Sequence, residues 1–448
     1  FLWPGGVLQA EMEKPAGEPF TVEELDRKGS SCPTLFAWTG DRYEFVSDLL
    51  GVGGIGFLER PWKYVNPDPT EYLKLDPIRI RPRQGDYHLS VVGQLEEVVY
   101  LDAVRLVAVD HPDGTEIYPD ERFSTGPEKP AEKIHRVRER FFPAAAWEED
   151  RLDVWERILH RDRIYPDGFE LLSFAGYAAP HSLTLSFLSL PAAERWVLYM
   201  YGWVDYEYSS STLAAHQAGI ELAPPALEIN DPATGNSRTY RSIGFPAGMP
   251  KMMTFEIPDP LPAGPVQLKL STNMRIYYDQ IFLAPAREEI PVRITRVPAG
   301  GARLRFLGSP REFSPDGLLP LLYDYQLATG GFPWKRMAGA FTRFGEVTEL
   351  LDSADDRFVI MGHGEEVLLT FPAGRFPALP PGWKRSFLFF ADGFCKDMDP
   401  NTAFPDSVEP LPFHAMSAYP YPSGEKFPDS SEHRRYRKEY NTRRVNVP

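Results

Sequence analysis

Short segments in which hydrophobic and polar residues alternate recur along most of the chain. In residues 41–46 (Asp-Arg-Tyr-Glu-Phe-Val) and 181–187 (His-Ser-Leu-Thr-Leu-Ser-Phe) the apolar side chains fall at every second position. Successive side chains of a β-strand point to opposite faces of its sheet, so this period of two predicts strands. Residues 197–203 form a nearly continuous aromatic and apolar run, which also predicts a strand.

One segment has a helical period instead. Between residues 147 and 161, Leu152, Trp155, Ile158 and Leu159 fall on one face of a helix. We expect a structural strut between domains here, because a helix with such a stripe ordinarily buries it against its neighbours.

Changes in these patterns divide the chain. Short strands separated by turns are typical of antiparallel β-sandwiches, and 448 residues exceed what a single hydrophobic core supports. We therefore predict an all-β protein of two or three tandem antiparallel, jelly-roll-like β-sandwiches, with one helical strut and an extended tail. The predicted divisions are 1–30 (strand and connector), 31–125 (sandwich), 126–165 (helical linker), 166–286 (jelly-roll-like sandwich), 287–395 (third β-rich domain) and 396–448 (tail).

The composition supports this fold and argues against some functions. Proline, at 45 residues, does not continue helices or donate to a sheet, so its abundance favours short strands joined by turns. The net charge of −15 argues against nucleic-acid binding, which needs a basic surface. No apolar run reaches the roughly 20 residues of a membrane span. Because no initiator Met or signal peptide is visible, we expect a processed chain or a piece of a longer one.

Motifs of known catalytic sites are missing from the sequence. It contains no G-x-S-x-G, H-E-x-x-H or phosphate-loop motif, and no two of its nine histidines stand four residues apart. Cys32 and Cys395 lie outside any C-x-x-C motif, which favours two buried thiols. With 63 acidic residues, a glycosidase-like pair of carboxylates arises by chance. We expect a protein that is not an enzyme, with a hydrolase as the alternative.

The first residues are similar to a known segment. Residues 1–9, Phe-Leu-Trp-Pro-Gly-Gly-Val-Leu-Gln, resemble the ASPIC/UnbV segment, which follows FG-GAP β-propeller repeats in exported bacterial proteins. The remaining chain resembles the long C-terminal extension of some members, at residues 31–36, 43–48 and 410–414. The resemblance implies an extracytoplasmic β protein (periplasmic, cell-surface or secreted) and no established enzyme activity. The chain itself carries no propeller repeat.

Aromatic residues gather in the second sandwich region. Flat rings stack on the apolar faces of sugars, and β-sandwiches commonly present such platforms. Alternate aromatic residues of a strand are also ordinary core residues, because pleating buries one face. Carbohydrate contact and core packing are therefore both open for this run. The candidates for carbohydrate contact are Trp196, Tyr201, Trp203, Tyr206 and Tyr208.

A loop near residue 400 has the spacing of a calcium site. Asp397, Asp399 and Asn401 place three oxygen ligands on one side of the loop, as Ca²⁺ prefers, and Glu409 or Asp406 would complete the shell. The glycine that calcium loops of the EF-hand type carry is replaced by Thr402. A turn with solvated carboxylates is the alternative.

The end of this acidic chain is basic. Such a segment favours an acidic surface, either on the same chain or on a neighbouring copy. We therefore expect a non-catalytic binding or assembly module that contacts protein, or another copy of itself in an oligomer or filament, through loops and tail. The alternative is a carbohydrate-binding or carbohydrate-active accessory protein that uses the aromatic run. The basic residues are Arg434, Arg435, Arg437, Lys438, Arg443 and Arg444.

Overall fold

The computed structural model describes residues 14–21, 33–75, 80–95, 97–124, 130, 133–232, 234–330 and 336–446. Residues 1–9, which carry the ASPIC/UnbV resemblance, and Cys32 lie outside the described residues. The described residues form mainly strands that pair antiparallel, and their α-helices are α1 (Ser209–Gln217) and α2 (Ser431–Glu439). The predicted all-β, antiparallel fold class is confirmed. No described helix is long and apolar enough to cross a bilayer.

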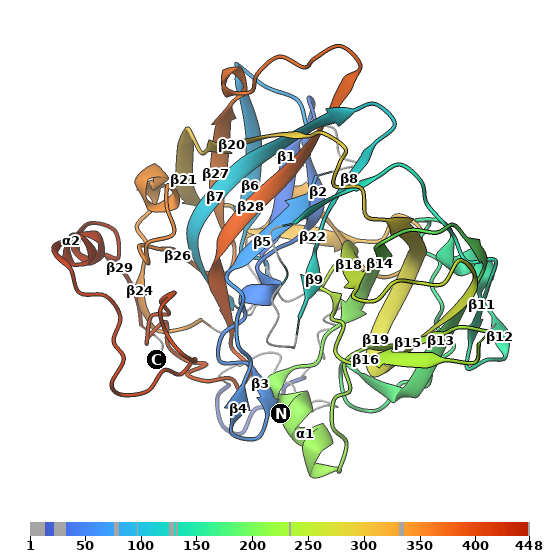
Figure 1. Ribbon diagram of the computed structural model, residues 1–448. Helices are drawn as coiled ribbons and strands as arrows, with labels where there is room; N and C mark the ends of the chain where they lie inside the picture. Colours follow the sequence, from blue (N-terminus) through green and yellow to red (C-terminus); the bar gives the residue numbers. More distant parts are fainter. Residues whose placement is uncertain are drawn as a thin grey trace.

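Strands from both ends of the chain build a first sandwich, at the centre of Figure 1. Aliphatic and aromatic residues of its two sheets share one core, including Leu35 and Leu89 from one sheet and Leu106 and Phe389 from the other. In order, one sheet is β2 (Tyr43–Asp48), β1 (Thr34–Trp38), β6 (Asp86–Val92), β27 (Glu365–Pro372), β21 (Gly301–Phe306) and β25 (Gly345–Glu346). The other is β20 (Arg293–Pro298), β7 (Glu97–Pro112), β28 (Trp383–Asp397) and β5 (Thr70–Lys74), and β26 (Val359–Met361) also pairs with β7.

The first and third predicted domains are therefore one domain. Strand β6 pairs with β27, and β7 pairs with β28 along nearly its whole length, so residues 31–125 and 287–395 share both sheets. The region 166–286 is an insertion between them. Periodicity indicates which face of a strand is buried, but it does not indicate a pairing partner more than 250 residues away. The predicted tandem order of separate domains was therefore wrong.

The inserted region forms the second sandwich, to the right in Figure 1. Its long strand β19 (Gly264–Pro285) pairs with β13 through its first half and with β14 through its second half. Trp196 and Leu198 pack with Leu185 and Leu268 in its core. The other strands are β11 (Ala145–Glu148), β12 (Leu152–Asp153), β13 (Tyr177–Leu190), β14 (Trp196–Asp205), β15 (Ala226–Asn230), β16 (Ser237–Tyr240) and β18 (Lys251–Ile257).

Small two-stranded sheets and short 3₁₀ turns complete the described chain. The sheets are β3 (Leu58–Arg60) with β4 (Lys63–Tyr64), β8 (Glu116–Pro119) with β10 (Ile134–Val137), β9 (Arg122–Phe123) with β17 (Phe245–Pro246), β22 (Ser309–Phe313) with β23 (Leu322–Thr329), and β24 (Gly339–Phe341) with β29 (Arg443–Val445). The 3₁₀ turns are η1 (Gly51–Gly53), η2 (Trp155–Ile158), η3 (Thr348–Leu351) and η4 (Ala373–Arg375).

The predicted helical strut does not form. Residues 145–148 pair with β13, a turn at Glu149 and Asp150 (φ 49° and 55°) follows, and only the 3₁₀ turn η2 is helical. Leu152 is 50% exposed and Trp155 37% exposed, so the apolar stripe is not buried along one side. Pairing with β13 outweighs the helical period, because a short helix needs a buried stripe for stability.

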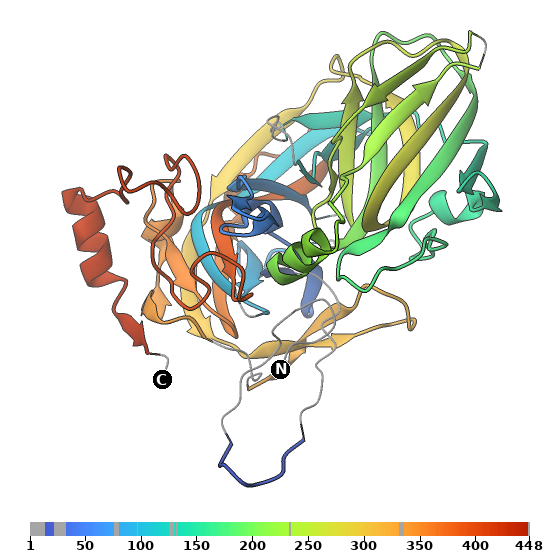
Figure 2. The same ribbon diagram turned by 90° about the horizontal axis from the view of Figure 1, so that it is seen from below.

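The tail after residue 396 is also packed rather than extended. Figures 1 and 2 show it lying along one side of the first sandwich. Tyr419, Tyr436 and Tyr440 are buried, and the Tyr436 hydroxyl donates to the carbonyl of Phe358 at 2.7 Å. Because proline-rich segments lack a regular period, the sequence did not indicate that aromatic side chains anchor this one.

A buried ion group joins the two sandwiches. Nζ of Lys251, on β18, lies 3.0 Å from Oδ1 of Asp48 and 2.8 Å from Oε1 of Glu71, which belong to the first sandwich. All three side chains are almost fully buried. Burial alone would lower the pKa of Lys251, but the two carboxylates outweigh it and raise that pKa. Gly248 (φ 93°) allows this approach, since a Cβ there would lie 2.0 Å from Oδ2 of Asp48.

Replacing Lys251 with Met should destabilise the protein strongly. The change leaves two buried carboxylates without their cation, which costs about 3–5 kcal/mol of the free energy of unfolding. Urea denaturation measures this loss. The control is Lys269→Met, which breaks the partly exposed pair with Asp150 and should cost no more than about 1 kcal/mol. Equal losses in the two variants would contradict the role assigned to Lys251.

Candidate functional site

A cavity of about 590 Å³ lies where the two sandwiches meet. The first sandwich contributes the β3–β4 hairpin and the paired ends of β7 and β28, and the inserted region contributes the segments around residues 206, 222 and 245. The lining combines aromatic rings with carboxylates. The rings are Phe57, Tyr64, Phe123, Tyr206 and Phe245, and the carboxylates are Glu59, Glu97, Glu207, Glu221 and Asp397.

One aromatic wall is built by pairing between distant segments. Strand β9 pairs with β17, which places Phe123 opposite Phe245 with stacked rings whose centroids are 5.0 Å apart. The ring of Tyr206 meets Phe245 edge-on at 6.4 Å. Gly244 (φ 89°) permits the close approach, since a Cβ there would lie 2.7 Å from the carbonyl oxygen of Phe123. The wall is therefore held by backbone pairing as well as by ring packing.

The β3–β4 hairpin forms another wall and carries an exposed ring at its turn. The amide of Leu58 donates to Oγ of Ser209 at 3.0 Å, which attaches the hairpin to α1. Trp62, in the turn, has φ 68° and is 97% exposed. It stands between Arg60 and Lys63, which both line the cavity. Figure 1 shows this hairpin beside α1.

The surroundings of Glu207, one of the acids of this cavity, change its protonation. Burial, with a smaller contribution from the charge of Asp205, raises the pKa of Glu207 to about 7. Its Oε2 atom is buried and has no hydrogen-bond partner among the described residues. Gly176 packs directly on its backbone, since a Cβ there would lie 2.2 Å from the Glu207 nitrogen. Below about pH 7 Glu207 is therefore a protonated, hydrogen-bond-donating acid.

Glu97 and Asp397 supply carboxylates from the first sandwich. They are cross-strand partners at the ends of β7 and β28, so both side chains enter the cavity from one point of the sheet. The carboxylates of Glu97 and Asp397 are hydrogen-bond acceptors, and the protonated Glu207 is a donor, for the hydroxyl groups of a ligand.

Of the five aromatic residues suggested by the sequence, only Tyr206 lines the cavity. Trp196 is completely buried and Trp203 is 4% exposed, stacked on Tyr277 at 4.4 Å, so these two are core residues and were wrong as carbohydrate contacts. Tyr201 instead packs under the guanidinium of Arg161. Tyr208 immediately precedes α1 and its amide donates to Ser211 Oγ.

The predicted calcium ligands are partly brought together. Oδ1 of Asp399 accepts hydrogen bonds from the hydroxyl of Ser210 at 2.7 Å and from the amide of Asn401 at 2.9 Å. Glu409 accepts from the amide of Leu411, and Asp397 lines the cavity. Hydrogen bonds between this loop and α1 thus organise Asp399 and Asn401, and Ca²⁺ binding stays a prediction.

The basic tail residues pair mostly within their own chain. Arg434 and Arg437 form ion pairs with Asp429, and Arg443 pairs with Glu365 at 2.6 Å. Arg435 lies 4.0 Å from Glu439, while Lys438 and Arg444 are exposed. This is the arrangement expected of a tail folded on its own chain. Assembly through the tail stays a prediction, which the mass of the chain in solution tests.

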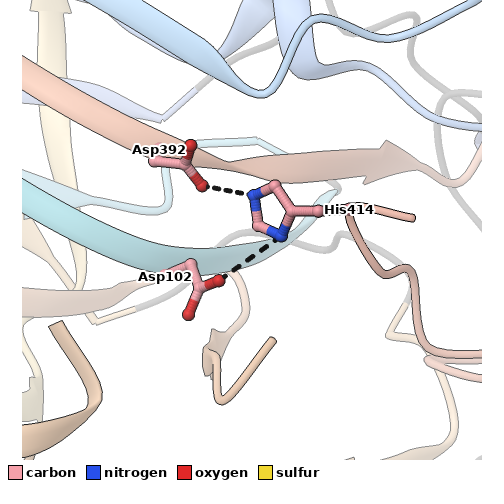
Figure 3. A group of neighbouring side chains, drawn as sticks. All are labelled: Asp102, Asp392 and His414. Atoms are coloured by element: carbon pink, nitrogen blue, oxygen red, sulfur yellow. Dashed lines mark hydrogen bonds and ion pairs between the residues drawn. The ribbon is translucent and has the colours of Figure 1, made fainter. Parts of the chain in front are cut away.

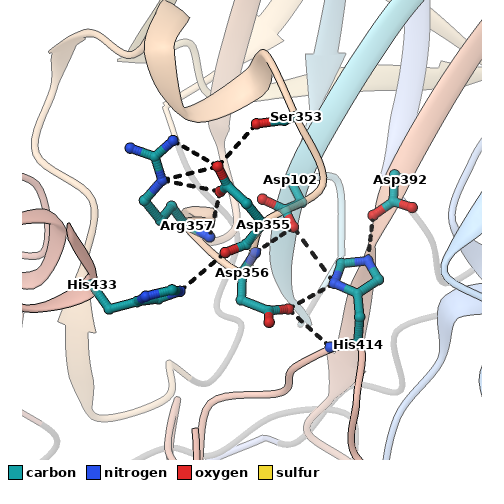
Figure 4. A network of polar contacts seen from close by, with 8 residues as sticks. All are labelled: Asp102, Ser353, Asp355, Asp356, Arg357, Asp392, His414 and His433. Atoms are coloured by element: carbon teal, nitrogen blue, oxygen red, sulfur yellow. Dashed lines mark hydrogen bonds and ion pairs between the residues drawn. The ribbon is translucent and has the colours of Figure 1, made fainter. Parts of the chain in front are cut away.

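A second polar centre lies where the tail meets β7 and β28 (Figure 3). Nε2 of His414 is 2.7 Å from Oδ1 of Asp392, and its Nδ1 is 2.7 Å from Oδ1 of Asp356 and 3.6 Å from Oδ2 of Asp102. The Asp356 amide donates to Oδ2 of Asp102 at 2.8 Å. Figure 4 shows the ion pair of Asp355 and Arg357 next to this centre.

Burial and mutual attraction set the charges of this second centre. Burial raises the pKa of Asp102 to about 8. Burial alone would lower the pKa of His414, but hydrogen bonds to Asp356 and Asp392 raise it to about 10. Sequence reasoning missed this centre. Its residues come from two strands, a loop and the tail, and no spacing in the sequence indicates that they meet.

Replacing Glu207 with Gln should make stability less sensitive to pH. The folded protein holds the Glu207 proton up to about pH 7, whereas the unfolded chain releases it near pH 4.5. The folded protein with Glu207 therefore loses stability as pH rises between these values, whereas the Glu207→Gln variant does not have this loss. We expect the melting temperature of Glu207→Gln, relative to the unmodified protein, to be higher at pH 8 than at pH 5. Glu170→Gln, at an exposed position, is the control, and an equal response of both variants would refute the assignment.

Comparisons with known proteins add little to this geometry. No family model and no curated protein matches the chain. Among solved structures, a family GH115 4-O-methyl-α-glucuronidase with specificity for decorated arabinogalactans is similar to 37% of this chain, with 10% identity and a TM-score of 0.17. The match spans 20% of that enzyme's chain. A TM-score this low does not establish a shared fold, so no function follows from the likeness.

Proposed function

We propose that the protein is a non-catalytic module that binds a short oligosaccharide in the cavity between its two sandwiches. The observation that carries this proposal is the combination of aromatic rings and carboxylates around one concave space. The volume of about 590 Å³ falls within the roughly 300–1,000 Å³ of small-ligand sites.

The lining chemistry suits a sugar. Rings such as Phe245 and Tyr64 offer apolar faces for the C–H groups of a pyranose, and Glu97 and Asp397 accept hydrogen bonds from its hydroxyls. Asn66, Ser124 and Ser242 add neutral donors and acceptors. Aromatic surface with a few polar groups is the usual composition of a small-ligand site.

The charge of the lining disfavours anionic ligands. Four carboxylates and the carboxyl group of Glu207 face two cationic side chains, Arg60 and Lys63. Lys63 is paired with Glu59, which reduces its availability for a phosphate or a carboxylate ligand. A neutral or amino sugar is therefore the better fit.

Trp62 extends the site beyond the cavity. An almost fully exposed indole costs solvation free energy unless a ligand covers it, and it stands between two lining residues. In the proposal it stacks on a sugar unit at the cavity entrance. An extracytoplasmic location, as implied by the resemblance of residues 1–9, belongs to the same proposal, since extracellular glycans are then accessible.

Replacing Trp62 with Ala should weaken oligosaccharide binding without unfolding the protein. Loss of one stacking contact of about 0.5–1.5 kcal/mol lowers affinity roughly 2- to 13-fold. The experiment is a glycan-array screen of the full chain, followed by titration calorimetry of the best oligosaccharide with each variant. The control is Leu188→Ala, an exposed apolar residue on β13 that does not line the cavity.

Different results separate the alternatives. Binding that is weakened in Trp62→Ala and unchanged in Leu188→Ala supports the proposal. No binding across the array, or equal binding by both variants, contradicts it. Release of reducing sugar from a bound oligosaccharide would contradict the non-catalytic part and favour a hydrolase.

A further inference from the structure

We propose that Asp102, Asp392 and His414 form a binding site for one divalent transition-metal ion, Zn²⁺ by its ligand chemistry, which fastens the tail to the first sandwich. One potential ligand atom from each of the three residues lies within 4.8 Å of the other two (Figure 3). Imidazole nitrogen and carboxylate oxygen are ligands that Zn²⁺ accepts. None of the three residues lines the cavity, so the inference is independent of the oligosaccharide proposal.

The first argument is an excess of buried negative charge. Asp102 has a fully buried side chain, and those of Asp392 and Asp356 are 4% and 13% exposed. Among the described residues, His414 is the only cationic partner in their ion pairs. Three carboxyl groups share one imidazolium, so negative charge exceeds positive charge where little water reaches them. Buried charges in proteins are normally paired or coordinate metals, so the site favours a divalent cation.

The second argument is an unsatisfied oxygen atom. Oδ1 of Asp102 is buried and accepts no hydrogen bond from any described residue, whereas Oδ2 accepts from the amide of Asp356 at 2.8 Å. Buried carboxylate oxygens almost always have a partner. A metal ion bound by both oxygens of the Asp102 carboxylate would supply one, and the described protein donors around it do not.

The third argument is the orientation of the imidazole. Oδ1 of Asp356 accepts from Nδ1 of His414 at 2.7 Å and from the His414 backbone amide at 2.9 Å (Figure 4). This assigns the proton to Nδ1 and directs Nε2 toward Asp392. Metal-binding histidines commonly donate their second ring nitrogen to a carboxylate in this way. Asp356 is therefore the positioning residue, and Nε2 is the metal-binding atom.

Metal binding at this position displaces the protons that its ligands carry. The hydrogen now shared by Nε2 of His414 and Oδ1 of Asp392 leaves to solvent, and the ion takes its place. The two atoms are 2.7 Å apart and must separate to about 3.3 Å for tetrahedral bonds of about 2.0 Å. The His414 side chain is 28% exposed and comes from the tail, so it has room to shift, and the shift must also bring the ion to Asp102, whose Oδ2 now lies 3.6 Å from Nδ1 of His414.

The neighbouring histidine of the tail provides a matched control. His433 lies beside the site in Figure 4 but donates to the carbonyl of Asp355 and touches none of the proposed ligands. His414→Gln removes a ligand, and His433→Gln removes a histidine of the same tail. Asp392→Asn keeps the shape of its side chain and removes a ligand charge, which gives a second variant if His414→Gln does not fold.

The test is calorimetric titration of the metal-free full chain with Zn²⁺, together with thermal unfolding in Zn²⁺ and in chelator. We expect one Zn²⁺ per chain, release of protons on binding and a higher melting temperature with Zn²⁺. Affinity should fall at least tenfold in His414→Gln and Asp392→Asn and stay unchanged in His433→Gln.

Two results would overturn the inference. One is the absence of Zn²⁺ binding, which would leave His414 as a protonated clamp between carboxylates. The other is binding that survives unchanged in His414→Gln and Asp392→Asn, which would place the ion elsewhere. Anomalous scattering at the zinc edge from a Zn²⁺-soaked crystal locates the ion directly, and a peak must lie at bonding distance from Nε2 of His414.

Discussion

The buried ion group of Lys251, Asp48 and Glu71 fixes how the two sandwiches sit against each other. A buried cation whose partners move away loses several kcal/mol, so the two bodies have little freedom to rotate without breaking the group. None of these residues lines the cavity, yet the cavity takes its walls from both sandwiches. The shape of the candidate binding site therefore depends on a contact outside it. Backbone hydrogen bonds from Lys74 and Met252 to the carboxylate of Glu121, both at 2.7 Å, reinforce the same junction.

The paired strands β7 and β28 connect the two candidate sites. Their ends carry Glu97 and Asp397 into the cavity, and Asp102 and Asp392 lie about five residues further along the same pair. The register shifts between Asp392 and Gly393, where a Cβ on Gly393 would lie 2.3 Å from the carbonyl oxygen of Tyr100. Such an irregularity re-aims neighbouring side chains. The paired strands β7 and β28 thus supply acidic residues to both candidate sites.

Local patterns in the sequence predicted strands well and their partners poorly. The alternation at 181–187 lies within β13, and the apolar run at 197–203 lies within β14. Sequence period did not show that β6 pairs with β27, because that pairing joins residues almost 300 positions apart. The sequence period also suggested too many carbohydrate contacts in the aromatic run, because alternation does not indicate which face of β14 meets the core. The centre at His414 was beyond prediction, because it exists only through strand register and the packing of the tail.

The insertion of the second sandwich has a consequence for how the chain is made. When a ribosome has synthesised β6 and β7, their partners β27 and β28 are still more than 250 residues away. The inserted sandwich, whose strands are contiguous in sequence, is complete long before that point. The strand edges of the first sandwich stay open in the meantime and are the part of the nascent chain most exposed to mispairing. The first sandwich, which takes its strands from before and after the insertion, is therefore the last to close.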